Sequence, residues 1–380
     1  MPRTGKSGLR SERQVEALAP VGAKADEQSL GWYGHVNGRK RALPTLGAVA
    51  RKAGVSASTA SRVLNSAPGL RVREETRQVV KAAALELNYV PNSSARSLRL
   101  SRAGAIGLMV DDPTNPIYGA IVQGARAEAS LLGLTVVLLG EESLARNLSE
   151  LLRTQRLDGL MVLPSTNAAL DLLQEMEPSP IPLVLVDELG RGGYPGVALP
   201  DAAGTRLATE HLIRLGHRRI GFLGGAPSAR AERRASGFRG AMEDAGLAIR
   251  REWLGIGGWN PAEGRVSARR LLSSRSRPSA VVVANGAAGV GALAGAADAG
   301  LRLPEDLSIA AVNDLWVAEY VRPTLTAVRM PMAELGREAV RATAAAVEGE
   351  RLPDLTIGEP GPELIVRNST APFGKGEPCT

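Results

Sequence analysis

A short run of hydroxyl-bearing side chains around one arginine is the first part of this sequence whose residue types and spacing could do chemistry. Successive helical residues turn by ~100°, which places the polar members of the run on one side of a helix expected over residues 57–65: Ser58, Ser61, Arg62 and Asn65. The apolar members fall on the opposite side: Ala60, Val63 and Leu64. An arginine can donate two hydrogen bonds to a guanine in the major groove. The pattern therefore indicates a helix that reads DNA, although ordinary packed helices show the same alternation.

Two further helices are expected to hold this one in place. Thr45 can cap a helix over residues 46–53 and Gly54 suits its end, with a buried face of Leu46, Val49, Ala50 and Ala53. Ser56 can cap the second helix in the same way. A third helix over residues 74–87 follows Arg73, which lacks a capping oxygen, and would pack Val79, Val80, Ala83 and Leu87 against the pair. A short turn between two helices, with the second facing outward, predicts a helix-turn-helix.

The distribution of charge supports a nucleic-acid partner. The whole chain has a formal net charge of +7. Residues 43–102 hold ten Lys/Arg against three Asp/Glu, whereas the residues after 102 hold 28 against 32. A basic segment of this size on a mildly acidic body indicates one domain that meets a polyanion and another that does not.

The composition argues against several other classes of protein. The chain of 380 residues is 44% hydrophobic and 22% charged, which is ordinary globular usage. Its single cysteine, Cys379, cannot form an intramolecular disulfide, and three scattered histidines leave little for a metal site. The sequence has no apolar run of membrane-spanning length and no signal-peptide core. We therefore expect a cytoplasmic protein with no metal and no other cofactor.

Beyond residue 104 the pattern changes to short apolar runs that alternate with amphipathic stretches of helical length. Seven runs have the length of strands: 106–110, 135–139, 159–163, 183–186, 220–223, 280–283 and 308–312. Strands that alternate with helices form parallel sheets that are buried on both faces. The fold class expected is an N-terminal all-α helix-turn-helix domain followed by an α/β core of two doubly wound parallel-sheet lobes.

Many short motifs, in this order, resemble the lactose/galactose repressor (LacI/GalR) family of transcriptional regulators. The family's DNA-binding signature is matched by residues 46–65, 74–77 and 87–98. The resemblance continues through Asn115-Pro116, Val186-Asp187, residues 208–212 and 215–221, Gly237-Phe238, and residues 291–293, 304–306 and 323–326. It covers about residues 43–371 and implies that the body has a periplasmic-binding-protein type I fold, with two lobes around a ligand cleft.

The resemblance also implies which residues contact DNA. Bases would be read by Ala57, Ser58 and Arg62, while phosphate or supporting contacts would come from Ser56, Thr59, Ser61 and Asn65. The segment from Asn92 to about residue 100 is similar to the family's hinge helix, which folds when it pairs with its twin on DNA. In that segment, Leu98 matches a leucine that wedges into a minor-groove step, and Arg99 matches its basic neighbour.

Six positions match the family's effector contacts: Ile117, Tyr118, Arg234, Trp259, Asn285 and Asn313. Arg234 would bind a hydroxyl or a carboxylate and Trp259 would stack on an apolar ligand face; the alternatives are a surface salt bridge and packing at a lobe edge. Three residues depart from the family's frequent carboxylates: Pro200, Gly286 and Asn313. Because sugar sites use carboxylates to accept hydroxyl protons, these departures leave a neutral sugar and an anionic ligand both open.

These observations divide the chain into five parts. Residues 1–42 are expected to be a disordered arm, or residues that precede the true start of the protein. The helix-turn-helix domain would span 43–91, the hinge helix 92–102, the core 103–371 and a tail 372–380. Within the core, the first lobe would hold about 103–199 and 324–355, and the second about 200–323 and 356–371.

The function expected from the resemblance is a sequence-specific repressor of transcription, not an enzyme. Its partners would be a pseudo-palindromic double-stranded operator, a second copy of the chain (a homodimer, with a tetramer left open) and a carbohydrate-like effector between the lobes. One alternative is a solute-binding receptor, which would need a secretion signal and would not need residues 43–102. The other is an α/β enzyme, but no nucleophile elbow, Walker loop or His/Cys cluster is visible.

Overall fold

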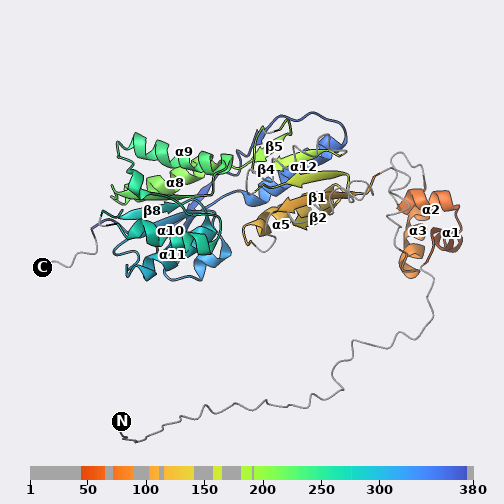
Figure 1. Cartoon of the computed structure of the whole chain (residues 1–380). Helices are drawn as coiled ribbons and strands as arrows, with labels where there is room; N and C mark the ends of the chain where they lie inside the picture. The colour runs from red at the N-terminus through yellow and green to blue at the C-terminus, as the bar shows by residue number, and fades with distance from the viewer. Residues whose placement is uncertain are drawn as a thin grey trace, which may run out of the picture. The chain divides into compact units, whose positions relative to one another are not determined.

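The chain folds into two compact units, residues 1–91 and 92–380, each described here by itself (Figure 1). The computed structural model describes residues 44–64, 72–89, 102–110, 115–140, 157–164, 181–190, 192–274 and 276–374.

The described part of the first unit contains the helices α1 (Leu46–Lys52), α2 (Ala57–Leu64) and α3 (Glu74–Glu86). The expected caps are present: Thr45 Oγ1 accepts a hydrogen bond from Ala48 N at 3.2 Å, and Ser56 Oγ accepts one from Thr59 N at 3.0 Å. The core of the unit joins all three helices and consists of Val49, Ala50, Ala60, Val63, Val80, Ala83 and Ala84. The sequence therefore predicts the helices and most of their buried faces correctly.

One of the expected core residues is on the surface. Val79, which we expected to pack against the first two helices, is 50% exposed, and Ala84 is buried on α3 in its place. At ~100° per residue, Val79 lies roughly a quarter turn away from the centre of the observed stripe of Val80, Ala83, Ala84 and Leu87. The apolar side chain of Val79 led to a wrong prediction, because the position of a residue around the helix axis decides whether it is buried.

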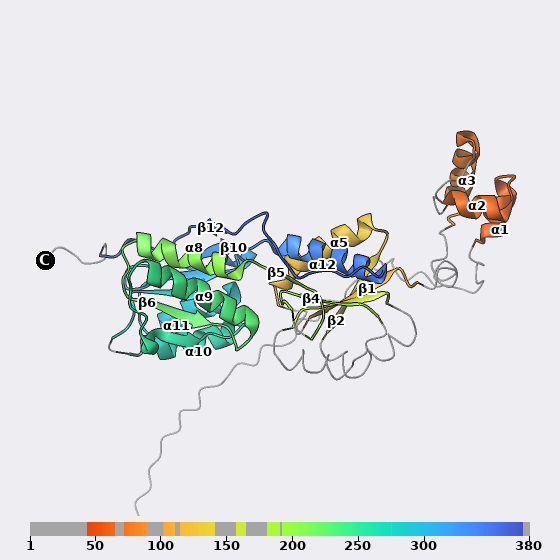
Figure 2. The ribbon, with the colours of Figure 1, turned by 90° about the horizontal axis from the view of Figure 1, so that it is seen from above.

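The second unit contains two six-stranded sheets, each with helices packed against it. The first sheet has the order β11-β5-β4-β3-β1-β2, and all its neighbouring strands are parallel. Its strands are β1 (Ala105–Val110), β2 (Thr135–Gly140), β3 (Gly159–Val162), β4 (Leu183–Val186), β5 (Gly196–Ala198) and β11 (Leu355–Thr356). The helices α5 (Tyr118–Leu131) and α12 (Met332–Val347) pack together over this sheet (Figure 2).

The second sheet has the order β12-β10-β9-β8-β6-β7, with only the β10–β12 pair antiparallel. Its strands are β6 (Ile220–Gly224), β7 (Leu254–Ile256), β8 (Ala280–Val283), β9 (Ser308–Val312), β10 (Thr326–Arg329) and β12 (Glu363–Ile365). The pair α8 (Asp201–Arg214) and α9 (Ala229–Asp244) lies on one face, and the pair α10 (Pro261–Leu272) and α11 (Gly286–Asp298) lies on the other (Figure 2). Two short 3₁₀ helices, η2 (Arg251–Trp253) and η3 (Trp316–Glu319), complete the described elements.

The chain passes between the two lobes three times. The crossings lie between β5 and α8, between β10 and α12, and between β11 and β12. The second crossing corrects our expectation that residues 324–355 all belong to the first lobe, because β10 pairs with β9 in the second sheet. The strand that β10 pairs with decides which lobe it belongs to, and its four residues do not show from the sequence which strand that is.

All seven strands expected from apolar runs are present, and β4, β8 and β9 have the expected bounds. The strands that we did not expect have two to four residues; β7 and β11 are largely exposed, and β12 is partly exposed. In the part of the chain that the structure describes, no helix is long and apolar enough to cross a membrane.

Candidate nucleic-acid interface and ligand site

The outward side of α2 carries the residues expected to read DNA bases. Ala57, Ser58 and Arg62 are all exposed, whereas Ala60 and Val63 between them are buried. Within the described residues, Arg62 has no ion-pair partner, so its guanidinium group is available to a ligand. The helix thus has a packed side and a polar side, as the sequence indicates.

The residues expected to support this helix or contact phosphate lie at its start and along its flank. Ser56 is exposed, and its hydroxyl is within 2.8 Å of the Thr59 hydroxyl. Thr59 and Ser61 are half-buried. The four other residues expected at DNA lie outside the described residues: Asn65, Asn92, Leu98 and Arg99.

A second site is built where the strands of the second lobe end. Arg234, on α9, is 0% exposed; its Nε donates to Asp201 Oδ1 at 2.7 Å, and its Nη1 donates to the carbonyl of Ala284 after β8. The close approach of α8 and α9 makes this ion pair possible, since a Cβ on Gly237 would lie 2.1 Å from Ala202 O. Arg234 is therefore a buried, fixed group, which excludes the surface salt bridge that we considered for it.

Two more arginines of α9 join a buried ionic cluster with residues after β4 and β5. Arg233 donates to Asp201 Oδ2 at 3.0 Å, and Arg230 Nη1 lies 3.2 Å from Asp187 Oδ2. Burial raises the pKa of Asp187, and the neighbouring Asp201 carboxylate raises it further, while the three arginines act in the opposite direction. Asp187 has a φ of +58°, in the left-handed region that aspartate and asparagine adopt more readily than most other residues.

Arg230 also joins the two lobes. Its Nη2 donates to the carbonyl of Pro164 at 2.9 Å, and both Pro164 and Asp187 follow strands of the first sheet. The same guanidinium lies 4.8 Å from the ring centroid of Trp259 in the second lobe. Arg230 therefore connects strand ends of one lobe to an aromatic ring of the other.

Trp259 lies beside the arginines and not at a free lobe edge. Its ring is 5.6 Å from the Arg234 guanidinium, and its edge lies against Gly225, where a Cβ would meet the ring at 2.2 Å. The indole Nε1 is buried and has no hydrogen-bond partner among the described residues. This side chain presents an unused donor as well as an aromatic face.

The two asparagines expected at the ligand differ in whether their side-chain atoms already have hydrogen-bond partners. Asn285 caps α11: its Oδ1 accepts from Ala288 N at 2.8 Å, and its Nδ2 donates to Gly258 O at 2.7 Å. Asn313 is 2% exposed, and within the described part of the chain neither its Oδ1 nor its Nδ2 has a partner. Asn313 also has a φ of +70°. It is the better candidate for a ligand contact, while Asn285 positions the loop.

The contacts bring four of the six expected ligand residues together. Arg234 reaches Ala284, Asn285 reaches Gly258 beside Trp259, and the carbonyl of Asn313 lies against Gly286. The remaining two, Ile117 and Tyr118, lie at the start of α5 in the first lobe, where Tyr118 is buried in the core and Ile117 packs against it.

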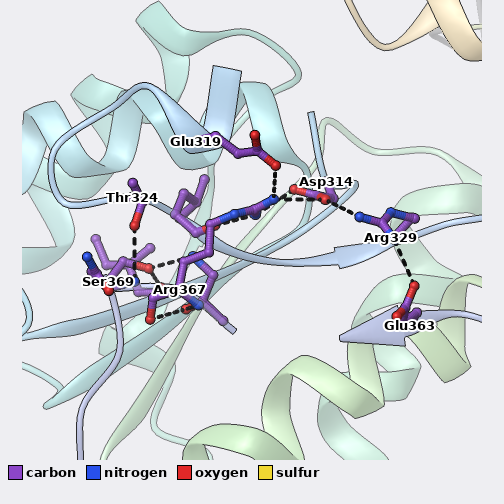
Figure 3. Close-up of polar contacts among 11 residues, drawn as sticks. Asp314, Glu319, Thr324, Arg329, Glu363, Arg367 and Ser369 are labelled. Atoms are coloured by element: carbon purple, nitrogen blue, oxygen red, sulfur yellow. Dashed lines mark hydrogen bonds and ion pairs between the residues drawn. The ribbon is translucent and has the colours of Figure 1, made fainter. Parts of the chain in front are cut away.

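Asp314 follows Asn313 but is not available to a ligand. Its carboxylate accepts from Arg367 Nη1 at 2.6 Å and Nη2 at 3.1 Å, and Arg329 Nη2 lies 3.4 Å from it (Figure 3). Arg367 also donates to Glu319, and Arg329 also donates to Glu363. This network fixes the C-terminal segment to β10 and leaves no carboxylate free at the end of β9.

Sequence reasoning missed Arg230, Arg233, Asp187 and Asp201 as members of the site. The signal was present, because arginines at i, i+3 and i+4 share one side of a helix. Asp187 directly follows a buried strand, and Asp201 starts the helix after another, where the carboxyl ends of parallel strands meet. Among the described residues, no group of His, Cys, Asp and Glu could hold a metal ion.

A helical unit with a polar reading helix and a two-lobed α/β unit with buried polar groups at its strand ends define a class: a DNA-binding regulator with a ligand-binding domain. Two family models match the chain: "Bacterial regulatory proteins, lacI family" over residues 45–92 and "Periplasmic binding protein-like domain" over residues 209–370. The HTH-type transcriptional repressor PurR of Haemophilus influenzae (strain PittEE) is 32% identical over 335 residues, 86% of this chain and 98% of the relative. The chain therefore belongs to the lacI family of bacterial regulatory proteins.

Solved structures of the family agree with this assignment. The lac repressor dimer bound to operator and the anti-inducer ONPF has a TM-score of 0.69 and 27% identity, covering 87% of this chain and 100% of that one. The complex of the transcriptional regulator CelR with cellobiose has a TM-score of 0.63 and 30% identity, covering 86% of this chain and 99% of that one. The protein is a DNA-binding transcriptional regulator with two parallel-sheet lobes.

Proposed function

We propose that the chain is a repressor whose affinity for a pseudo-palindromic operator is set by a carbohydrate-like effector bound between its two lobes. The observation that carries this proposal is the set of buried polar groups at the strand ends of the second lobe that have no partner in the described structure: Arg234 Nη2, Trp259 Nε1, and both polar atoms of Asn313. Buried polar groups are almost always hydrogen-bonded, so an unpaired group calls for a ligand or ordered water. The cellobiose bound by CelR supports a carbohydrate-like effector.

The DNA contacts would be divided by type along α2. Arg62 would give specificity through paired hydrogen bonds to guanine, Ser58 would bond a base edge, and Ala57 would offer a methyl group. Ser56, Thr59 and Ser61 would position the helix on phosphates. We assign Asn65, Asn92, Leu98 and Arg99 to the same interface on the basis of the sequence resemblance alone.

The regulator would act as a homodimer in the cytoplasm, where its DNA lies. A pseudo-palindromic operator requires two copies of the reading helix related by two-fold symmetry. The lac repressor structure, a dimer on its operator, supports this assembly.

A binding experiment with promoter DNA tests the proposed function. Full-length protein is titrated onto a fragment from the promoter beside its own gene, and onto a scrambled fragment of equal length, at one fixed salt concentration. Specific binding should be at least ~10³-fold tighter than binding to the scrambled fragment, the low end for specific DNA-binding proteins. If the protein binds this fragment, and further promoter fragments tested in the same way, no more tightly than the scrambled fragment, the proposal is contradicted.

A further inference from the structure

The unpaired buried polar groups at the strand ends of the second lobe are mainly donors of hydrogen bonds. Arg234 Nη2 and Trp259 Nε1 can only donate, and Asn313 offers one amide donor and one carbonyl acceptor. Both Arg234 and Asn313 are almost wholly buried, at 0% and 2% exposure. A ligand that satisfies these groups must therefore bring more acceptors than donors.

The carboxylates around the site already have partners. Asp201 is held by Arg233 and Arg234, and Asp187 by Arg230. Glu263 accepts from the backbone N of Trp259 at 2.8 Å. Asp314 is bound by Arg367, as Figure 3 shows. In the described structure, arginines hold the carboxylates of Asp187, Asp201 and Asp314, so these three are not left to accept the hydroxyl protons that a neutral sugar presents.

The positions that could restore an acceptor hold residues without a charge. Gly286 has no side chain, and a Cβ there would lie 2.1 Å from the carbonyl of Asn313, so a larger residue would not fit. Asn313 itself is neutral. The guanidinium groups of Arg230 and Arg234, each paired with a carboxylate, lie 4.8 and 5.6 Å from the Trp259 ring centroid, next to the unpaired indole donor.

We infer that the effector is an acidic molecule, a carbohydrate-sized compound whose carboxylate or phosphate oxygens accept hydrogen bonds from Arg234, Trp259 and Asn313. An oxyanion is an acceptor without donors, and its bonds to a guanidinium are charge-assisted and strong. The inference rests on the proposed function, since it names the class of ligand for the same cleft. Because the three donor atoms are buried, a ligand that reaches them must displace some of the groups that cover them.

The test compares matched neutral and acidic probes on the full-length protein by titration calorimetry. Suitable sets are D-glucose, D-gluconate and D-glucose 6-phosphate; D-ribose, D-ribonate and D-ribose 5-phosphate; adenosine and adenosine 5′-monophosphate; and inorganic phosphate alone. At least one acidic probe should bind at least tenfold more tightly than its neutral parent, and the two acidic members of a set separate a carboxylate from a phosphate. A neutral parent that binds as tightly as its acids, or an absence of binding by every acid, would overturn the inference.

The variant Asn313→Asp keeps the shape of the side chain but should disfavour an acidic ligand. It replaces an amide donor with a carboxylate at a positive φ that Asp tolerates about as well as Asn. The acidic probe should lose at least tenfold in affinity while its neutral parent does not. Asn368→Asp adds the same charge at an exposed position of the same lobe and should leave both affinities unchanged. Equal losses in the two variants would mean that general charge repulsion, and not the cleft, binds the anion.

The outcome for the ligand class can be separated from the outcome for the proposed function. Operator affinity is measured on the same samples with and without the bound probe. An acid that binds through Asn313 but leaves operator affinity unchanged supports the ligand class and contradicts control by an effector. A neutral probe that binds and changes operator affinity supports effector control and overturns the ligand class.

Discussion

Arg234, a proposed ligand contact, is also part of the fold. Its Nε and Nη1 are committed to Asp201 and Ala284, and only Nη2 is left for a ligand. Asn285 differs, because its two polar atoms are already used for capping and for the Gly258 carbonyl. Within the described residues, the side-chain polar atoms of Asn313 and the indole N–H of Trp259 make no hydrogen bonds. Mutation of Arg234 should therefore lower both stability and ligand affinity, whereas mutation of Asn313 should mainly change ligand affinity.

Arg234→Met should destabilise the protein as well as weaken ligand binding. Removing one partner of a buried ion pair costs about 3–5 kcal/mol, and the cost should lie near the lower figure because Arg233 still neutralises Asp201. Arg233→Met, at a side chain that is 23% exposed, should cost less. Urea denaturation of both variants measures the difference. Equal stabilities for Arg234→Met and the wild type would show that the buried pair contributes nothing.

Arg62→Ala should relax the preference for one base pair in each half-site, at a cost of about 1–3 kcal/mol for the preferred base. The loss should appear on the operator and not on random DNA, because the side chain would contact a base. Lys81→Ala removes an exposed charge from α3 and serves as the control. Fluorescence anisotropy on operators with single-base changes measures both. A uniform loss on operator and random DNA would assign Arg62 to phosphate.

At the scale of elements, the C-terminal segment after β12 completes the second lobe. Ser369 is fully buried; its hydroxyl accepts from Thr326 N at 2.8 Å and donates to Ile309 O at 2.6 Å. His217 lies between Ser279, Ser308 and the carbonyl of Ala371 at 3.0–3.1 Å. A short polar segment thus ties β9 and β10 to the turn before β6.

Ser369→Ala should lower the free energy of unfolding by about 1–3 kcal/mol, because the buried N–H of Thr326 loses its acceptor. Ser273→Ala is the matched control, since that side chain is exposed and, among the described residues, its hydroxyl bonds the Arg270 carbonyl at 2.8 Å. Thermal or urea denaturation reads the change. A Ser369→Ala protein as stable as the control would contradict a structural role for this segment.

His217 should make stability fall as the pH is lowered. Burial lowers the pKa of His217, so the native imidazole stays neutral below about pH 6.5, where the unfolded one takes up a proton. The contribution is complete above about 6.5 and is lost as the pH falls toward the lowered native pKa. His217→Gln should therefore flatten the dependence of melting temperature on pH between 7.5 and 5.5. An unchanged slope in this variant would show that other groups set the pH dependence.

The sequence predicts elements better than it predicts how they meet. Runs such as 183–186 are buried on both faces of a parallel sheet, so continuous apolar character marks their bounds, and β4 has these bounds in the structure. Strands such as β7 and β11 are short and exposed, and they leave no such signal. The resemblance predicts ligand contacts for Arg234 and Asn313, and these stay predictions. The ionic cluster of Arg230 with Asp187 was not predicted, because it depends on which strand ends face each other across the lobes. That information lies in tertiary contacts.

At the scale of the whole core, three chain crossings and the Arg230 contacts connect the two lobes. A ligand that binds one arrangement of the lobes better than another shifts the population toward it. Arg230 is well placed to take part, since it contacts Asp187 and Pro164 in one lobe and Trp259 in the other. A ligand bound beside Trp259 would lie next to these contacts, so we expect ligand binding and lobe arrangement to be linked.

Arg230→Met should weaken this linkage. It removes the contacts with Asp187 and Pro164 but leaves the helix-turn-helix residues unchanged, so operator binding without ligand should be retained. The ratio of operator affinities with and without ligand should move toward one. Fluorescence anisotropy of the variant and the wild type at matched salt measures both values. If the ratio of operator affinities is the same in the variant and the wild type, Arg230 does not contribute to the coupling.

The most direct test of the central claim is the operator affinity of the wild-type, full-length protein with and without a saturating cleft ligand. The ligand is one identified by calorimetry whose binding is weakened by Asn313→Asp. The account predicts a change in operator affinity of about 5- to 150-fold, or 1–3 kcal/mol, and by linkage the same factor in ligand affinity when operator is bound. An operator affinity that is the same with the cleft empty and with it saturated would contradict the account.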